Sequence, residues 1–140
     1  MPGRMVLIVD DDDEIREITK LALELMGGWH VIDADRGAAA LSLAREHRPD
    51  VVLLDVMMPE MDGPTTFRHM QNDPSTAQIP VILLTAKVLA GHTQLWDDLA
   101  VTGVISKPFN PTTLSDDIDR LLEARANGIG PGMAQRHLSA

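Results

Sequence analysis

Carboxylate, hydroxyl and ammonium side chains follow four of the five short apolar runs in this sequence. They are Asp10 and Asp11 after the first run, Asp55 after the third, Thr85 after the fourth and Lys107 after the fifth. Brought together, these residues would place three carboxylates beside a hydroxyl and an ammonium group. Two like charges about 4 Å apart repel by roughly 4 kcal/mol at an effective dielectric constant of about 20. Such a cluster therefore needs a bound cation.

The types of donor atom indicate which cation and which reaction. Oxygen ligands without cysteine or a nearby histidine favour Mg²⁺ over zinc, and Mg²⁺ usually binds carboxylates together with phosphate oxygens. Aspartate can attack phosphorus once a metal neutralises the incoming charge, which makes Asp55 the candidate nucleophile. Lys107 would act as a point charge on the phosphoryl oxygens, and the Thr85 hydroxyl would donate a hydrogen bond to one of them.

The apolar runs predict five strands, at residues 5–9, 30–33, 51–54, 81–84 and 103–106. They alternate with longer stretches of helical period, and three of them are almost entirely Val, Ile and Leu. This pattern is typical of a parallel sheet covered by helices on both faces. Right-handed crossovers then predict a doubly wound α/β fold, in which functional groups gather at the carboxyl ends of the strands.

Apolar residues at helical spacing predict five helices between and after the strands. Their members are Ile15, Ile18, Ala22 and Leu25; Ala40, Leu41 and Ala44; Phe67 and Met70; Leu95, Trp96 and Leu99; and Leu114, Ile118, Leu121 and Leu122. Gly27-Gly28 is expected to end the first helix in a left-handed cap. Asp12, Asp13 and Glu14 are predicted to cap that helix rather than bind metal, because carboxylates favour helix N-termini.

Composition narrows the class of protein. A chain of 140 residues, 44% hydrophobic and 24% charged, predicts one globular domain. The net charge of -9 argues against direct contact with nucleic acid, and the lack of cysteine excludes disulfide scaffolds and thiol catalysis. No signal-like segment is present and no apolar run reaches the roughly 20 residues that span a bilayer. We expect no membrane contact and a cytoplasmic location.

The C-terminal residues differ in composition from the rest. Residues 1–125 are predicted to form the phosphoacceptor domain and residues 126–140 a flexible tail or linker stub, since three glycines and a proline cannot continue a helix. A tail of this length leaves no room for an output domain. The chain is expected to be a stand-alone regulator or a fragment of a larger regulator or hybrid kinase.

Four motifs in this register resemble those of the response-regulator receiver family. They are Val9-Asp10-Asp11, Leu54-Asp55-Val56-Met57-Met58-Pro59-Glu60-Met61-Asp62-Gly63, Leu84-Thr85-Ala86 and Lys107-Pro108-Phe109. The combination is highly specific, and the resemblance covers about residues 5–124. It implies a flavodoxin-like, CheY-like fold with strand order 2-1-3-4-5. It also implies that Asp55 is phosphorylated by a histidine kinase or a histidine phosphotransfer protein.

The resemblance further implies roles for the residues around the acceptor. Asp11 would bind Mg²⁺ directly, Asp10 partly through water, and the backbone carbonyl of Met57 would complete the protein ligands together with Asp55. Mn²⁺ would substitute for Mg²⁺. The Lys107-Pro108 bond resembles one that the family holds in cis, which would aim the ammonium group at the site.

The chain departs from the family at one of its two switch positions. Thr85 would shift toward the phosphoryl group, but its aromatic switch partner is replaced by Val104, which cannot swing between rotamers as a tyrosine does. Met57 and Lys87 occupy the positions expected to tune the phosphate lifetime, and neither can act as a base for water. Our hypothesis is that Met57 shields the phosphorus and makes self-hydrolysis slow.

The resemblance implies protein partners rather than a small substrate. A downstream effector is expected on the face formed by the fourth helix, the fifth strand and the fifth helix. The chain is expected to be a monomer or a homodimer formed on phosphorylation, and to catalyse only its own phosphorylation and dephosphorylation.

Three other functions compete with the receiver interpretation. A haloacid dehalogenase-type phosphatase needs an aspartate two residues after the nucleophile, where Met57 stands. A nucleotide-binding domain needs a glycine-rich loop after the first strand, where acids stand instead. A receiver-like scaffold that binds partners without phosphorylation stays open.

Overall fold

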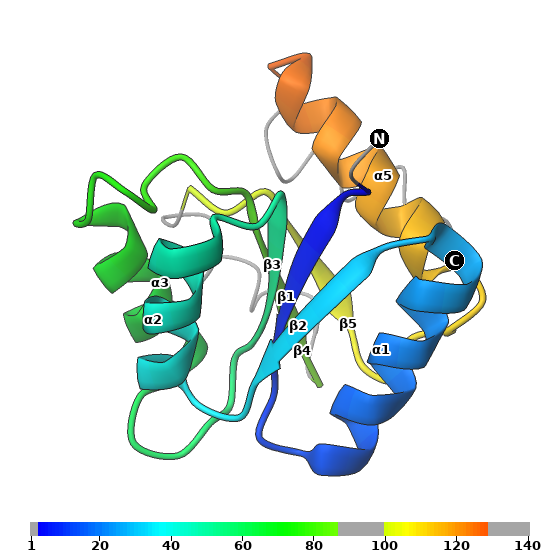
Figure 1. The fold of residues 1–140 in the computed structure, drawn as a ribbon, viewed down its shortest axis with the longest axis horizontal. Helices are drawn as coiled ribbons and strands as arrows, with labels where there is room; N and C mark the ends of the chain where they lie inside the picture. Colours follow the sequence, from blue (N-terminus) through cyan, green and yellow to red (C-terminus); the bar gives the residue numbers. More distant parts are fainter. Residues whose placement is uncertain (1–2, 87–99, 129–140) are drawn as a thin grey trace.

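The computed structural model describes residues 3–86 and 100–128. Five parallel strands form one twisted sheet in the order β2-β1-β3-β4-β5, which confirms the predicted order (Figure 1). The strands are β1 (Met5–Val9), β2 (His30–Ala34), β3 (Val51–Asp55), β4 (Val81–Thr85) and β5 (Gly103–Ser106). Three of them, β2, β3 and β4, extend one residue beyond the predicted runs. That extension places Asp55 and Thr85 inside the sheet.

Helices cover both faces of the sheet, as a doubly wound fold requires. They are α1 (Asp13–Gly27), α2 (Gly37–His47), α3 (Gly63–Gln71) and α5 (Leu114–Ala126). In Figure 1, α2 and α3 lie together on one face, and α1 and α5 lie together on the other. The helix predicted around Leu95, Trp96 and Leu99 lies outside the described residues.

The core has two layers because successive side chains of a strand point to opposite faces. Leu7, Leu54 and Leu83 pack with Phe67 and Met70 beneath α2 and α3. The alternate strand residues, among them Ile8, Leu53 and Leu84, pack on the other side of the sheet. There they contact apolar residues of the helices, including Leu23 of α1 and Ile118 of α5. Burial on both faces explains why these strands read as continuous apolar runs.

The ends of the helices follow the predicted capping residues. Asp12 is the N-cap of α1, and its side chain accepts hydrogen bonds from the backbone N–H groups of Glu14 and Ile15. Gly28 closes that helix with φ of 65°, the left-handed conformation that glycine adopts without strain. Helix α5 ends at Ala126, one residue into the predicted tail, and residues 129–140 lie outside the described part. Among the helices described, none is both long and apolar enough to cross a bilayer.

Candidate functional site

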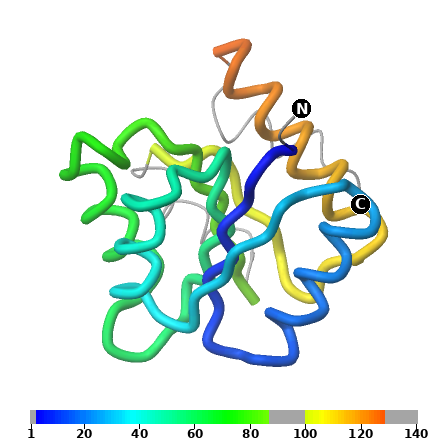
Figure 2. The backbone as a smooth tube through the Cα atoms, in the orientation of Figure 1, coloured from blue at the N-terminus to red at the C-terminus, as the bar shows by residue number. Residues whose placement is uncertain are grey.

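The predicted site residues converge at one edge of the sheet. Figure 2 shows that the loops leaving β1 and β3 lie at the same end of the molecule, the lower end of the view. Asp10 and Asp11 follow β1 directly, Asp55 is the last residue of β3 and Thr85 the last residue of β4. Parallel strands produce this convergence because all their carboxyl ends face the same way.

Three carboxylates form the centre of this edge. One carboxylate oxygen each from Asp10, Asp11 and Asp55 lies within 4.8 Å of the other two. Asp10 is fully buried and Asp55 nearly so, whereas Asp11 is exposed. Hard oxygen donors at this spacing, two of them shielded and one open to solvent, fit a divalent cation such as Mg²⁺. The donor set therefore agrees with the predicted metal.

Lys107 reaches into the carboxylate cluster from the loop after β5. Its Nζ atom lies 2.6 Å from Asp10 Oδ2 and 3.3 Å from Asp55 Oδ1, and only 13% of its side chain is exposed. The Lys107-Pro108 peptide is cis, as predicted, and the backbone N–H of Lys107 donates to the carbonyl of Thr85. Burial alone would lower the pKa of Lys107. Its hydrogen bond to Asp10 and the negative charges of Asp10 and Asp55 outweigh burial and raise the pKa, so the ammonium stays charged.

Asp55 has a pKa raised to about 6 from an ordinary 3.8. Burial is the main cause, and repulsion from Asp10 adds to it. Attraction to Lys107 and a hydrogen bond from the backbone N–H of Met57, 3.4 Å from Asp55 Oδ1, act in the opposite direction. A shielded carboxylate next to a second one is costly to ionise, so a cation at this place would relieve the repulsion.

The remaining predicted residues differ in where they lie. Thr85 is buried, and its neighbour Leu84 pairs with Asp55 across the β3–β4 ladder. Val104 is buried in β5, opposite Leu83. The side chain of Met57 is 74% exposed, so it extends into solvent rather than into the core. Lys87 lies outside the described residues.

Gly63 holds the loop after β3 close to the acceptor. Its N–H donates to the carbonyl of Val56, and a Cβ atom at this residue would lie 2.5 Å from the carbonyl oxygen of Asp55. Any side chain here would displace the backbone of the acceptor strand. Sequence reasoning named Gly63 only as a motif member; the packing reason comes from the structure.

Arg16 is a contact of the site that sequence reasoning missed. Its Nη1 atom donates to the backbone carbonyl of Asp10 at 2.9 Å. The signal that could have indicated it is a basic residue two positions after five consecutive acids, residues 10–14, because a cation so close to an acidic run is expected to pair with some of these carboxylates.

Comparisons with known proteins find similar sequences along most of this chain. The model of the response regulator receiver domain matches residues 6–119. Among curated relatives, the phosphate regulon transcriptional regulatory protein PhoB of Pseudomonas aeruginosa is 34% identical over 132 residues, which cover 94% of this chain and 56% of PhoB. The chain spans about half the length of the curated relatives it matches.

Solved structures share the fold. Chemotaxis protein CheY4 of Vibrio cholerae superimposes with a TM-score of 0.79 and 32% identity over 86% of this chain and 99% of that one. The receiver domain of the sensor histidine kinase PA1611 of Pseudomonas aeruginosa, which carries a magnesium ion in its active-site cleft, has a TM-score of 0.78 over 87% of this chain and 99% of its own. Its sequence is 24% identical to this chain, so the similarity shows a shared fold alone.

Proposed function

This chain belongs to the response-regulator receiver family, and from that premise we propose that Asp55 accepts a phosphoryl group from a histidine kinase or a histidine phosphotransfer protein. One observation carries the proposal: Asp55 is almost fully buried, contacts Lys107 and lies beside the carboxylates of Asp10 and Asp11. A buried acid with a raised pKa, a lysine and a cation-binding cluster together are typical of a reactive site rather than a structural ion pair.

The chain's own residues would divide the work of phosphoryl transfer. A carboxylate oxygen of Asp55 attacks the phosphorus, the bond from phosphorus to the donor's histidine nitrogen breaks, and that nitrogen keeps the electron pair. Lys107 and the Thr85 hydroxyl hold phosphoryl oxygens, so they stabilise charge that the transfer concentrates at the site. Mg²⁺ would be held by Asp10, Asp11, Asp55 and the Met57 carbonyl. When bound, it would neutralise the negative charge of the phosphoryl group.

Phosphorylation would then switch a protein contact. The acyl phosphate carries more negative charge than the carboxylate it replaces, and Thr85, at the end of the strand that pairs with the strand of Asp55, would shift toward it. We propose that this shift reaches the surface through β4 and β5, with the buried Val104 in place of an aromatic partner. The relatives named as transcriptional regulators are about twice as long as this chain. The predicted absence of direct nucleic-acid contact therefore concerns only the 140 residues of this chain and stays a prediction.

Acetyl phosphate with Mg²⁺ tests the function without the cognate kinase. We expect the intact mass of the protein to rise by one phosphoryl group, and the gain to disappear with EDTA and in Asp55→Asn. An Asp35→Asn variant is the matched control, because it removes a carboxylate that is exposed and paired with Arg36. If a folded protein gains no mass under any condition, the scaffold interpretation replaces the receiver interpretation.

Replacing Met57 with asparagine should shorten the lifetime of the phosphorylated state. The exposed thioether cannot orient a water molecule, whereas an amide can donate to and accept from one. We expect phosphate loss to be about tenfold faster in Met57→Asn, because one hydrogen bond that orients the attacking water is worth about 1 kcal/mol. The decay of the phosphorylated mass after removal of acetyl phosphate measures it, with Met57→Leu as the control. Equal decay in all three proteins contradicts the shielding hypothesis.

A further inference from the structure

We propose that Arg16 is a positioning residue for the metal site: it fixes the loop that carries Asp10 and Asp11, and thereby sets the affinity for Mg²⁺. This inference rests on the proposed function. It adds a residue that lies outside the four motifs and donates no ligand atom to the metal.

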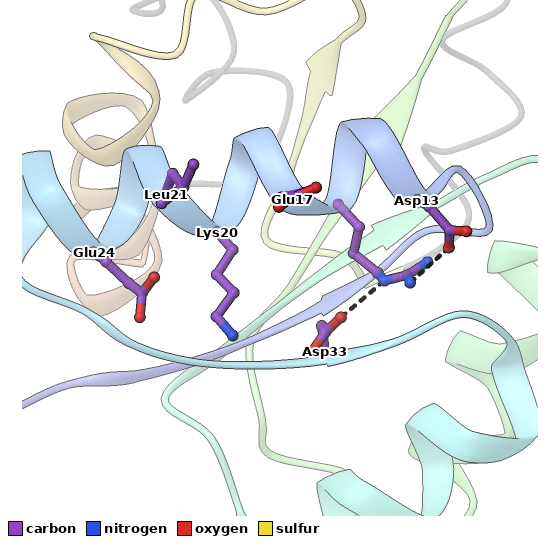
Figure 3. A pocket seen from close by; sticks show the side chains of 7 residues that line it. Asp13, Glu17, Lys20, Leu21, Glu24 and Asp33 are labelled. Atoms are coloured by element: carbon purple, nitrogen blue, oxygen red, sulfur yellow. Dashed lines mark hydrogen bonds and ion pairs between the residues drawn. The ribbon is translucent and has the colours of Figure 1, made fainter.

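The guanidinium of Arg16 ties together three segments of the chain. Nη1 donates to the Asp10 carbonyl at 2.9 Å, Nε to Asp33 Oδ2 at 2.8 Å and Nη2 to Asp13 Oδ1 at 2.7 Å. Figure 3 shows Asp13 at the start of α1 and Asp33 on β2, joined by dashed lines to one side chain between them. Only 17% of the Arg16 side chain is exposed, so it is largely enclosed by these segments.

The contact to the Asp10 carbonyl determines the direction of a peptide plane. The peptide bond is planar, so the direction of the Asp10 carbonyl also fixes the N–H and the starting position of Asp11. The rest of Asp10 is held separately: its N–H donates to Ala34, and its Oδ1 accepts from the N–H of Asp12 at 2.9 Å. Asp11 is exposed, and its position therefore depends on the backbone that Arg16 holds.

Arginine suits this place for a geometric reason. Its planar fork donates in three directions at once, to one carbonyl and two carboxylates, which a lysine ammonium on a flexible chain does not reproduce. Side chains that orient metal ligands without touching the metal typically change metal affinity by about 10- to 100-fold when they are replaced.

The sign of the effect separates positioning from simple charge. A cation near the acidic cluster repels Mg²⁺, so removing it should tighten binding if charge alone mattered. Loss of positioning should weaken binding instead. A purely structural role should lower the melting temperature of the protein and leave the Mg²⁺ affinity unchanged.

Titration calorimetry of the unphosphorylated protein with MgCl₂ provides the test. We expect the Kd for Mg²⁺ to rise about tenfold in both Arg16→Gln and Arg16→Lys. In Arg36→Gln, which removes the same charge from an exposed pair with Asp35, the Kd should stay within about twofold of wild type, as surface pairs contribute little. A Kd that is unchanged or lower in both Arg16 variants overturns the proposal.

A second variant covers the case in which both Arg16 variants fail to fold. Asp33→Asn leaves Arg16 in place but removes the charge of one carboxylate that holds its guanidinium. The Kd for Mg²⁺ should rise about threefold relative to Asp35→Asn, which removes an equal charge nearby, and an equal Kd overturns the proposal. Wild-type protein that binds no Mg²⁺ and gains no phosphoryl group would contradict the proposed function itself, before any variant is compared.

Discussion

Lys107→Met should accept a phosphoryl group from acetyl phosphate roughly 100-fold more slowly than wild type. Its ammonium lies 2.6 Å from Asp10 and 3.3 Å from Asp55, within reach of oxygens on a group attached to Asp55. Removing one donor that stabilises developing charge typically costs about 100- to 1,000-fold in rate. Methionine keeps an unbranched side chain of similar length, one atom shorter, and removes the charge. The time course of intact mass at saturating Mg²⁺ measures the effect.

Mg²⁺ affinity distinguishes this effect from general damage to the site. Lys107 is a cation in contact with two of the proposed ligands, so its removal should tighten Mg²⁺ binding while the rate falls. Lys20→Met, a change of the same kind on α1 away from the cluster, should alter neither quantity by more than about twofold. A rate in Lys107→Met within twofold of wild type would remove the lysine from the proposed mechanism.

Asp55→Asn should raise the free energy of unfolding of the Mg²⁺-free protein by about 2 kcal/mol above neutral pH. The native state holds the pKa of Asp55 at about 6 because of burial and of Asp10, whereas the unfolded chain returns it to 3.8. Each pKa unit corresponds to about 1.4 kcal/mol, so ionising this carboxylate in the native state opposes folding by a few kcal/mol at most. Asparagine removes that penalty and leaves Asp10 paired with Lys107.

The pH dependence of this stability difference has a definite sign. Between about pH 4 and pH 7 the native state binds more protons at Asp55 than the unfolded state does, so the stability of the wild type decreases as pH rises through this window. The advantage of Asp55→Asn should therefore disappear near pH 4 and be complete above about pH 7. Urea unfolding in EDTA at several pH values measures it, with Asp35→Asn as the control. A stability difference that does not change with pH would contradict the assigned pKa.

The strands and the convergence of the site could be predicted from local pattern and one topological rule, whereas the strand order came from the resemblance to the receiver family. Runs such as 51–54 and 81–84 are apolar at every position, which indicates strands buried on both faces. The apolar pattern stops at Leu54 and Leu84, but the ladder continues, since Asp55 pairs with Leu84 and Thr85 with Ser106. A polar residue at a buried strand end cannot be recognised from hydrophobicity alone.

The contacts that hold the site in shape could not be predicted in the same way. Arg16 joins α1, β2 and the loop after β1, and periodicity says nothing about how these segments meet. The close approach of Gly63 to the Asp55 carbonyl depends on the path of a loop. For Lys107, charge predicts carboxylate partners, but only the structure shows that Asp10 is nearer than Asp55.

The position of the phosphoryl group tests the central claim most directly. After reaction with acetyl phosphate and Mg²⁺, borohydride reduces an acyl phosphate to the alcohol, which converts a phosphorylated aspartate to homoserine and allows the residue to be located by peptide sequencing in a mass spectrometer. We predict homoserine at position 55 alone, dependent on Mg²⁺. Homoserine at Asp10 or Asp11, or a phosphoryl group that resists borohydride and stays on a histidine, would contradict the account.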